Sequence, residues 1–143
     1  MEPVVDHIEI TVKDMATAVP FYDALMPLLG FDLARKSRAY LETWDFDVVE
    51  YSHPRLGFAI NSPRASVAGD DVHRRRPGSV HHIAFRAASR GEVDRIHGEL
   101  VRIGATIVDG PRVFPEHTPA GYYAVFFKDP GGIKFEVVHT PEQ

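Results

Sequence analysis

Two histidines and one glutamate have the types and the placement that a metal-binding site requires. His7 and His82 lie 75 positions apart, and each opens a stretch of alternating polar and apolar residues that leads into an amphipathic helix. Glu136 stands in an apolar stretch near the end of the chain, where a carboxylate is costly unless something compensates it. Neutral imidazoles and a carboxylate are suitable ligands for a divalent cation with open coordination positions. We therefore predict a metal site made of His7, His82 and Glu136.

The prediction depends on the three residues as a set. A single strand histidine is more often a hydrogen-bonded structural residue, and a single glutamate in a terminal strand often points to water. The equal placement of the two histidines in two related halves is what favours ligation. One divalent ion of Fe, Mn, Zn, Ni or Co would accept such ligands, and the residue types do not choose among these metals.

Two further positions are candidates for proton transfer. Glu9 lies two residues after His7 and so shares its side of a strand, where it could act as a general base or a fourth ligand. A salt bridge to Arg86 is the alternative for Glu9. Tyr122 and Tyr123 are consecutive in a predicted strand, so only one of them can face the site. We take Tyr123 as the candidate proton donor, with Tyr122 as the alternative.

Four other histidines are expected to be structural or solvent-exposed. His81 and His139 should face away from the neighbouring ligands, His97 lies on a predicted helix, and His117 belongs to a loop that could cover the site. Three aromatic side chains are explained as well by core packing as by the wall of a pocket for an aromatic substrate, namely Trp44, Phe46 and Phe58.

The elements that must position these residues follow one order in both halves. The first half has a period-two strand, a helix opened by Asp14 and stopped by Gly30, and short strand candidates at 31–34, 39–44, 48–51 and 56–60. The second half has a strand, a helix opened by Ser89 with Glu92 at the capping-box spacing and stopped by Gly104, and strands at 105–109, 122–127 and 133–139.

This order predicts an α+β fold of two βαβββ modules. We place the first module at residues 4–61, a linker at 62–79 and the second module at 80–140, all within one domain that spans residues 1–143. The helix of the first half contains Pro27, which should distort its last turn because proline lacks an amide donor.

Composition excludes several classes of function. The 143 residues include no cysteine, so thiolate nucleophiles, disulfides and cysteine-bound metal centres are excluded. A net charge of −4, with Arg74-Arg75-Arg76 as the main basic run, gives no footprint for nucleic acid. No apolar stretch approaches the ~20 residues of a membrane helix. We expect a cytoplasmic protein whose partner is a small molecule rather than nucleic acid or membrane.

Three segments carry a resemblance to a known family. The N-terminal DHIEITVKDMATAVPFYDALMPLLGF, the central VHHIAFRA and the C-terminal FFKDPGGIKFEVVH resemble the vicinal oxygen chelate superfamily, which includes glyoxalases, bleomycin resistance proteins and extradiol dioxygenases. The resemblance covers nearly the whole chain. It implies a cup-shaped incomplete β-barrel with a divalent metal inside, held from the first and last strands of the modules, and a homodimer.

The positions that match this family refine the expected chemistry. His7, His82 and Glu136 match its ligands, whereas Ala59 stands where glyoxalase I and similar epimerases carry another ligand. The resemblance implies a metal-dependent enzyme acting on a small oxygen-bearing substrate, with isomerase or lyase chemistry as the first choice. An extradiol-type Fe(II) dioxygenase and a metal-free drug-binding protein of the bleomycin resistance type are the alternatives. The cup could close within one chain or by exchange of modules between two subunits.

Overall fold

The chain folds into two compact units of the same design. The computed structural model describes residues 3–117 and 119–141. One unit ends at Asp71 and the next begins at Val72; they are called the first and the second module below. Each contains one four-stranded sheet and one long helix.

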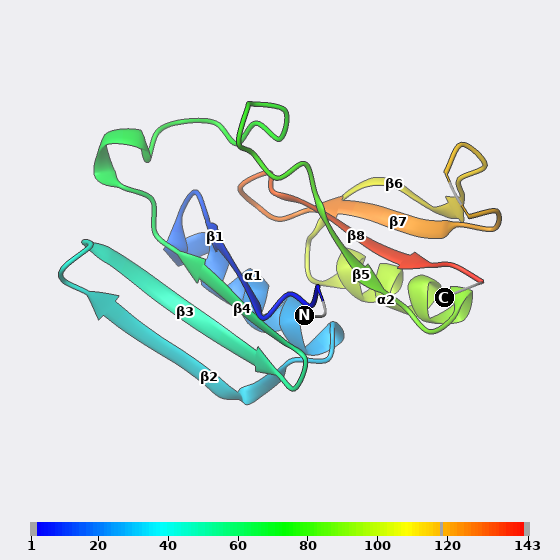
Figure 1. Ribbon diagram of the computed structural model, residues 1–143, viewed down its shortest axis with the longest axis horizontal. Coiled ribbons are helices and arrows are strands. Elements are labelled where there is room, and N and C mark those ends of the chain that lie inside the picture. The colour runs from blue at the N-terminus through cyan, green and yellow to red at the C-terminus, as the bar shows by residue number, and fades with distance from the viewer. Residues whose placement is uncertain (1–2, 118, 142–143) are drawn as a thin grey trace. The chain divides into compact units, whose positions relative to one another are not determined.

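The first module is an open sheet backed by one helix (Figure 1). Its strands lie in the order β1-β4-β3-β2, with β1 parallel to β4 and the other neighbours antiparallel. Its elements are β1 (His7–Thr11), α1 (Met15–Leu28), β2 (Asp32–Leu41), β3 (Phe46–His53), β4 (Leu56–Asn61) and the short 3₁₀ helix η1 (Ala65–Val67).

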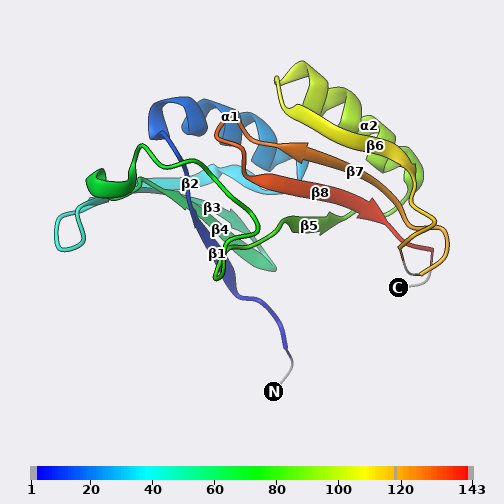
Figure 2. The same cartoon turned by 90° about the horizontal axis from the view of Figure 1, so that it is seen from above.

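The second module repeats this topology. The strand order β5-β8-β7-β6 again has one parallel pair, between β5 and β8. Figure 2 shows α2 lying along one face of the sheet. The elements are β5 (Ile83–Arg86), α2 (Arg90–Arg102), β6 (Thr106–Val113), β7 (Tyr123–Lys128) and β8 (Lys134–His139). The α+β class and the βαβββ order in both halves are thus confirmed.

Each core forms between the helix and one face of its sheet. In the first module the buried aromatic rings of Tyr22 on α1 and Phe58 on β4 stack with centroids 6.0 Å apart. In the second module Val93, Ile96 and Leu100 of α2 are buried. Because side chains alternate along a strand, the opposite face of each sheet is left for other groups. The candidate site residues lie on that opposite face, as shown below.

The helices begin where the capping residues predict. The Asp14 carboxylate accepts a hydrogen bond from the Thr17 amide at 2.8 Å, and the Ser89 hydroxyl accepts one from the Glu92 amide at 3.1 Å. The Glu92 carboxylate reaches back to the Ala88 amide at 2.6 Å, one residue before the cap itself. Among the described residues, no helix is long and apolar enough to cross a membrane.

One strand of the first module differs from its prediction. The separate candidates at 31–34 and 39–44 both overlap the single strand β2, whose pairing with β3 shifts register between Asp32 and Ser37, and residues 42–44 belong to the turn after it. β2 is an edge strand and most of its residues are exposed, so it lacks the alternation that marks a half-buried strand. Pro27 leaves α1 intact as far as Leu28, and the helix ends in a tighter turn in which the Gly30 amide donates to the Pro27 carbonyl at 3.1 Å.

Candidate metal centre

His82 and Glu136 lie together in the second module. Glu136 is on β8 with 0% of its surface exposed, and His82 immediately precedes β5, the parallel neighbour of β8. The Nε2 atom of His82 is 3.1 Å from Oε2 of Glu136. The Tyr122 hydroxyl donates a hydrogen bond to the other carboxylate oxygen, Oε1. The two side chains predicted as ligands in this half are therefore in contact.

The Glu136 carboxylate has features that suit a metal ligand. Its Oε2 is buried and accepts no hydrogen bond from the described residues, which costs about 1 to 3 kcal/mol in a protein interior. A nitrogen and an oxygen that bind one ion at about 2.1 Å each, at a right angle, lie roughly 3 Å apart. The separation of the His82 and Glu136 atoms agrees with this value. The donor set of the second module thus fits a divalent cation.

The residue before each of His7 and His82 contacts Nδ1 of the imidazole ring. The Nδ1 atom of His7 lies 2.7 Å from Asp6 Oδ1, and Nδ1 of His82 lies 2.8 Å from Nδ1 of His81. In both modules Nε2 is consequently the nitrogen available to a metal. A hydrogen bond at the far nitrogen fixes the tautomer and the orientation of a ligating imidazole. His81 therefore contacts its neighbour, contrary to the expectation that it faces away.

The charge of Asp6 also affects the protonation of His7. The hydrogen bond to Asp6, followed by the charge of that carboxylate, raises the pKa of His7 above its usual 6.5. His81 shows the opposite effect, because desolvation and then the nearby His82 lower its pKa. Only the neutral imidazole binds a metal ion. Metal binding through His7 should therefore weaken already in mildly acidic solution.

His7 and Glu9 share one side of β1, as predicted from their spacing. Glu9 lies directly across from Ala59 on β4, and Ala59 lies across from Glu50 on β3. Directly paired residues have their side chains on the same face of a sheet. Both carboxylates therefore flank Ala59. His7, Glu9 and Glu50 line one pocket of about 290 Å³.

The Glu9 carboxylate is oriented by an amide of the neighbouring strand. The Asn61 Nδ2 group donates a hydrogen bond to Glu9 Oε1 at 2.6 Å. Glu50 accepts a hydrogen bond from the Ser37 hydroxyl at 2.9 Å. Glu9 thus has one oxygen held in place beside His7, on the exposed side of the sheet. This geometry suits a group that exchanges a proton with a bound molecule.

The strand registers make the equivalence of the two modules explicit. Glu9 pairs with Ala59 in the first module, and Ala84 pairs with Glu136 in the second. The equivalent cross-strand pair therefore contains one alanine and one glutamate in each module. The glutamate is on the first strand of the first module and on the last strand of the second module. Position 59 lacks a carboxylate of its own, and Glu9 supplies one from the strand beside it.

The structure places Tyr122, and not the predicted Tyr123, beside the candidate ligand Glu136. Tyr122, not Tyr123, contacts Glu136, whereas the Tyr123 hydroxyl donates to Asp94 Oδ1 of α2 at 2.6 Å. Tyr123 thus lies on the helix side of the sheet. Tyr122 is therefore the tyrosine beside the candidate ligand, and its pKa is raised by desolvation and then by the hydrogen bond to Glu136.

Aromatic rings surround the Glu136 side of the second sheet. Phe114 and Phe126 form a buried cluster with Tyr122 packed against it. The His82 ring stands edge-on to Phe126 at 5.8 Å, and the His117 ring stacks on Phe114 at 5.5 Å and lies 5.0 Å from Tyr122. The exposed His117 thus packs against this cluster rather than standing alone. The apolar rings reduce water access to the Glu136 carboxylate.

The predicted ligand set is divided between the modules. His82 and Glu136 belong to the second and His7 to the first. Neither in residues 3–71 nor in the described part of 72–141 do three side chains of histidine, aspartate or glutamate gather into one ligand cluster. What the structure brings together is one ligand pair, His82 with Glu136, and one carboxylate neighbour for His7.

Three features of the candidate site escaped the sequence-based prediction. Glu50 beside Ala59, the Asn61 amide on Glu9, and the His81 ring on His82 all matter for the candidate site. The strand pairing that creates the first two is not encoded in local periodicity. The equal spacing of Asp6 and His81 before the two histidines was a visible signal for the third.

Known proteins share this sequence pattern and fold. Residues 4–137 match the family model described as the Glyoxalase/Bleomycin resistance protein/Dioxygenase superfamily. The protein YqjT of Bacillus subtilis, itself uncharacterized, is 29% identical over 132 residues, which cover 92% of this chain and 95% of YqjT.

Two solved structures extend this similarity to the fold. A candidate glyoxalase from Bacillus halodurans is 26% identical, with a TM-score of 0.78 and 97% of both chains covered. A mutant of the fosfomycin resistance protein FosX from Listeria monocytogenes, complexed with Mn(II) and 1S,2S-dihydroxypropylphosphonic acid, is 17% identical, with a TM-score of 0.65 and coverage of 99% and 96%. The family model covers most of the chain, so the protein belongs to the Glyoxalase/Bleomycin resistance protein/Dioxygenase superfamily.

Proposed function

We propose that the protein is a metal-dependent enzyme that acts on a small oxygen-bearing substrate by isomerase or lyase chemistry. The observation that carries the proposal is the buried Glu136 Oε2, which accepts no hydrogen bond among the described residues and lies 3.1 Å from His82 Nε2. A buried carboxylate oxygen without a hydrogen-bond donor, beside an imidazole nitrogen, fits a pair of ligands for one cation.

His7, His82 and Glu136 would hold the ion, each through an atom that the surrounding contacts leave available. Asp6 and His81 fix the two imidazoles through Nδ1. When bound, a divalent metal stabilises the negative charge that develops on a substrate oxygen. Three protein ligands leave coordination positions for one or two substrate oxygens.

Glu9 is the base in this proposal. Asn61 holds Oε1 of its carboxylate, so Oε2 is the atom that takes a proton from a carbon next to the substrate carbonyl. Glu50 is the second candidate base, because it flanks Ala59 from the other side and lines the same pocket. Tyr122 holds Glu136 and so positions a ligand rather than the substrate.

Metal analysis of three alanine variants tests the ligand set. The protein is purified without chelator, and its metal content is compared with that of His7→Ala, Glu136→Ala and, as a matched control, His97→Ala on α2. We expect the first two variants to lose most of the metal and the control to keep it. Full metal in both ligand variants would overturn the proposal.

The identity of the metal separates the remaining reactions. Iron with uptake of dioxygen and opening of an aromatic ring would replace isomerase or lyase chemistry by that of an extradiol-type dioxygenase. Tight binding of a drug by chelator-treated protein, with no metal in any preparation, would favour a binding protein of the bleomycin resistance type. Glu9→Gln provides the kinetic test, because a base is needed for isomerisation but not for metal binding.

We further propose that the protein acts as a homodimer. His7 can then join His82 and Glu136 of the same chain or of the second copy, and mixing two inactive variants distinguishes these cases. Refolding His7→Ala together with Glu136→Ala yields one intact site per mixed dimer if the site is shared between chains. It yields none if each chain completes its own site.

A further inference from the structure

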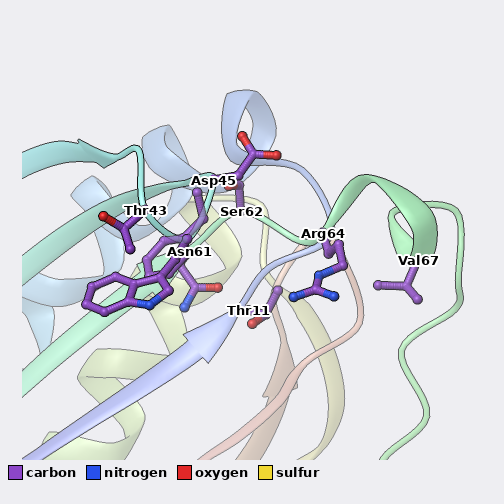
Figure 3. Close-up of a pocket in the computed structure, with 9 residues that line it drawn as sticks. Thr11, Thr43, Asp45, Asn61, Ser62, Arg64 and Val67 are labelled. Atoms are coloured by element: carbon purple, nitrogen blue, oxygen red, sulfur yellow. The ribbon is translucent and has the colours of Figure 1, made fainter.

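The first module contains a second, larger pocket that the proposed chemistry does not use. It has a volume of about 900 Å³ and is formed by the end of β1, the β2–β3 turn, and the end of β4 with the segment after it. Figure 3 shows its labelled side chains, with the Arg64 guanidinium on the side of Thr11. All of its lining residues belong to the first module, namely Thr11, Thr43, Trp44, Asp45, Phe46, Asn61, Ser62, Arg64 and Val67.

An exposed indole forms one wall of this pocket. Trp44 is the only tryptophan of the chain and is 67% exposed. Its ring stacks on Phe46 with centroids 6.3 Å apart and planes inclined by 20°. The turn that presents it is held by Asp45, which has a positive φ of 52° and accepts a hydrogen bond from the Tyr40 hydroxyl. The result is a flat aromatic platform with one open face.

The charge that faces this pocket without a partner is positive. The Arg64 guanidinium forms neither an ion pair nor a hydrogen bond with other described residues, and only its backbone carbonyl is bound, by the Val67 amide at 3.0 Å. The Asp45 carboxylate is already bound by Tyr40. Ser62 accepts a hydrogen bond from the Asp47 amide through its hydroxyl oxygen, so its own proton remains available for donation. A guanidinium with hydroxyl groups near it favours a carboxylate or phosphate group.

We propose that this pocket binds a planar aromatic ring carrying an anionic group, with the ring on Trp44 and the anion at Arg64. Stacking on indole favours aromatic over saturated rings, and a charge-assisted hydrogen bond favours the anion over its neutral analogue. Neither contact involves the metal ligands. The pocket is therefore a binding site in its own right.

The pocket adjoins the candidate base, which indicates what the ligand is. Asn61 lines the pocket and donates to Glu9, and Thr11 lies on the same strand four residues after His7, roughly 13 Å away. A substrate with oxygens at one end and an aromatic anion at the other would span that distance. This assignment to the substrate rests on the proposed function, whereas binding in the pocket does not.

Three related compounds test the pocket on the full chain treated with chelator. Phenylacetate has the ring and the charge, phenylacetamide lacks the charge, and cyclohexylacetate lacks the aromatic ring. We expect phenylacetate to change the emission of Trp44 saturably, with a dissociation constant in the millimolar range, as its small size dictates. The amide should bind about tenfold more weakly, and the cyclohexyl compound several-fold more weakly.

Substitution of the arginine makes the test specific. In Arg64→Gln, phenylacetate and phenylacetamide should bind equally, whereas Arg35→Gln, an exposed arginine of β2, should keep the tenfold preference. Calorimetry with Trp44→Leu, which removes the reporter, should show binding several-fold weaker. An unchanged preference in Arg64→Gln would overturn the assignment of the anion.

Two other outcomes separate this inference from alternatives. If Trp44 emission changed on dilution of ligand-free protein and did not respond to phenylacetate, the indole would be a contact between copies and the inference would be wrong. Phenylacetate binding that persists in His7→Ala and Glu136→Ala would support the pocket even if both variants retained full metal. The failure of the proposed metal site and that of the pocket are therefore distinguishable.

Discussion

Replacement of Glu136 by glutamine should change stability in opposite directions with and without metal. In the metal-free protein, glutamine keeps a carbonyl oxygen for the Tyr122 hydroxyl and offers its amide group to His82 Nε2. It thereby removes the buried oxygen that has no hydrogen bond. The expected gain is the cost of that oxygen, about 1 to 3 kcal/mol.

The gain converts into a measurable shift of the melting temperature. For 143 residues the entropy of unfolding is about 0.3 kcal/mol/K, so the metal-free variant should melt about 3 to 10 °C above the wild type. Saturating metal reverses the order. When the free metal concentration is about 1,000 times the dissociation constant, the bound ion stabilises the native protein by about 4 kcal/mol. The Glu136→Gln variant should lose most of this stabilisation, because its amide is neutral.

Calorimetric or fluorescence melts of the two proteins, with chelator and with excess divalent metal, measure the reversal. Glu42→Gln, at an exposed position, controls for the general effect of removing one negative charge. Metal-free Glu136→Gln that melts below the wild type would refute the reasoning, because it would mean that the carboxylate is stabilising without an ion. Equal stabilisation of both proteins by metal would refute the ligand role.

Two other substitutions probe the contacts around the ligands. Tyr122→Phe removes a hydrogen-bond donor to Glu136. It should lower the free energy of unfolding by about 1 to 2 kcal/mol, measured by melts, and weaken metal affinity about 10-fold to 100-fold, measured by competition with a metal indicator. Unchanged metal affinity would mean that Tyr122 does not position the ligand. Asp6→Asn should lower the His7 pKa, because it removes the charged hydrogen-bond partner that raises this pKa most. Metal binding should then persist to lower pH, while affinity at about pH 8 weakens because the imidazole is less well oriented. Parallel titration curves of Asp6→Asn and the wild type, without a crossing, would count against this account.

Much of the fold was predictable because its signals are local. Asp14 and Ser89 open the helices through their own side chains, and Gly30 and Gly104 follow where they end. The edge strand β2 was divided wrongly because both of its faces are largely exposed, so no apolar period marks it. Exposure is a property of the assembled sheet and not of the ten residues themselves.

The candidate site was predictable in its residue types but not in its contacts. The cost of a carboxylate in an apolar strand identified Glu136, and its complete burial agrees with that reasoning. The choice of Tyr123 failed because alternation alone does not say which face of a strand comes first. The neighbours of Glu9 depend on which strands pair, and that pairing joins residues about fifty positions apart.

The two modules suggest how one duplicated design divides its work. Each module has one carboxylate in the equivalent cross-strand pair, which is Glu9 with Ala59 in the first module and Ala84 with Glu136 in the second. Glu136 is fully buried and fixed by a phenol, conditions that suit a permanent ligand because they limit both its movement and its access to water. Glu9 is exposed and held through one oxygen only, conditions that suit a group that must gain and lose protons. A carboxylate moved to the neighbouring strand would thus serve as a base instead of a ligand, without a change of fold. The double substitution Glu9→Ala with Ala59→Glu should therefore add a fourth ligand and abolish turnover.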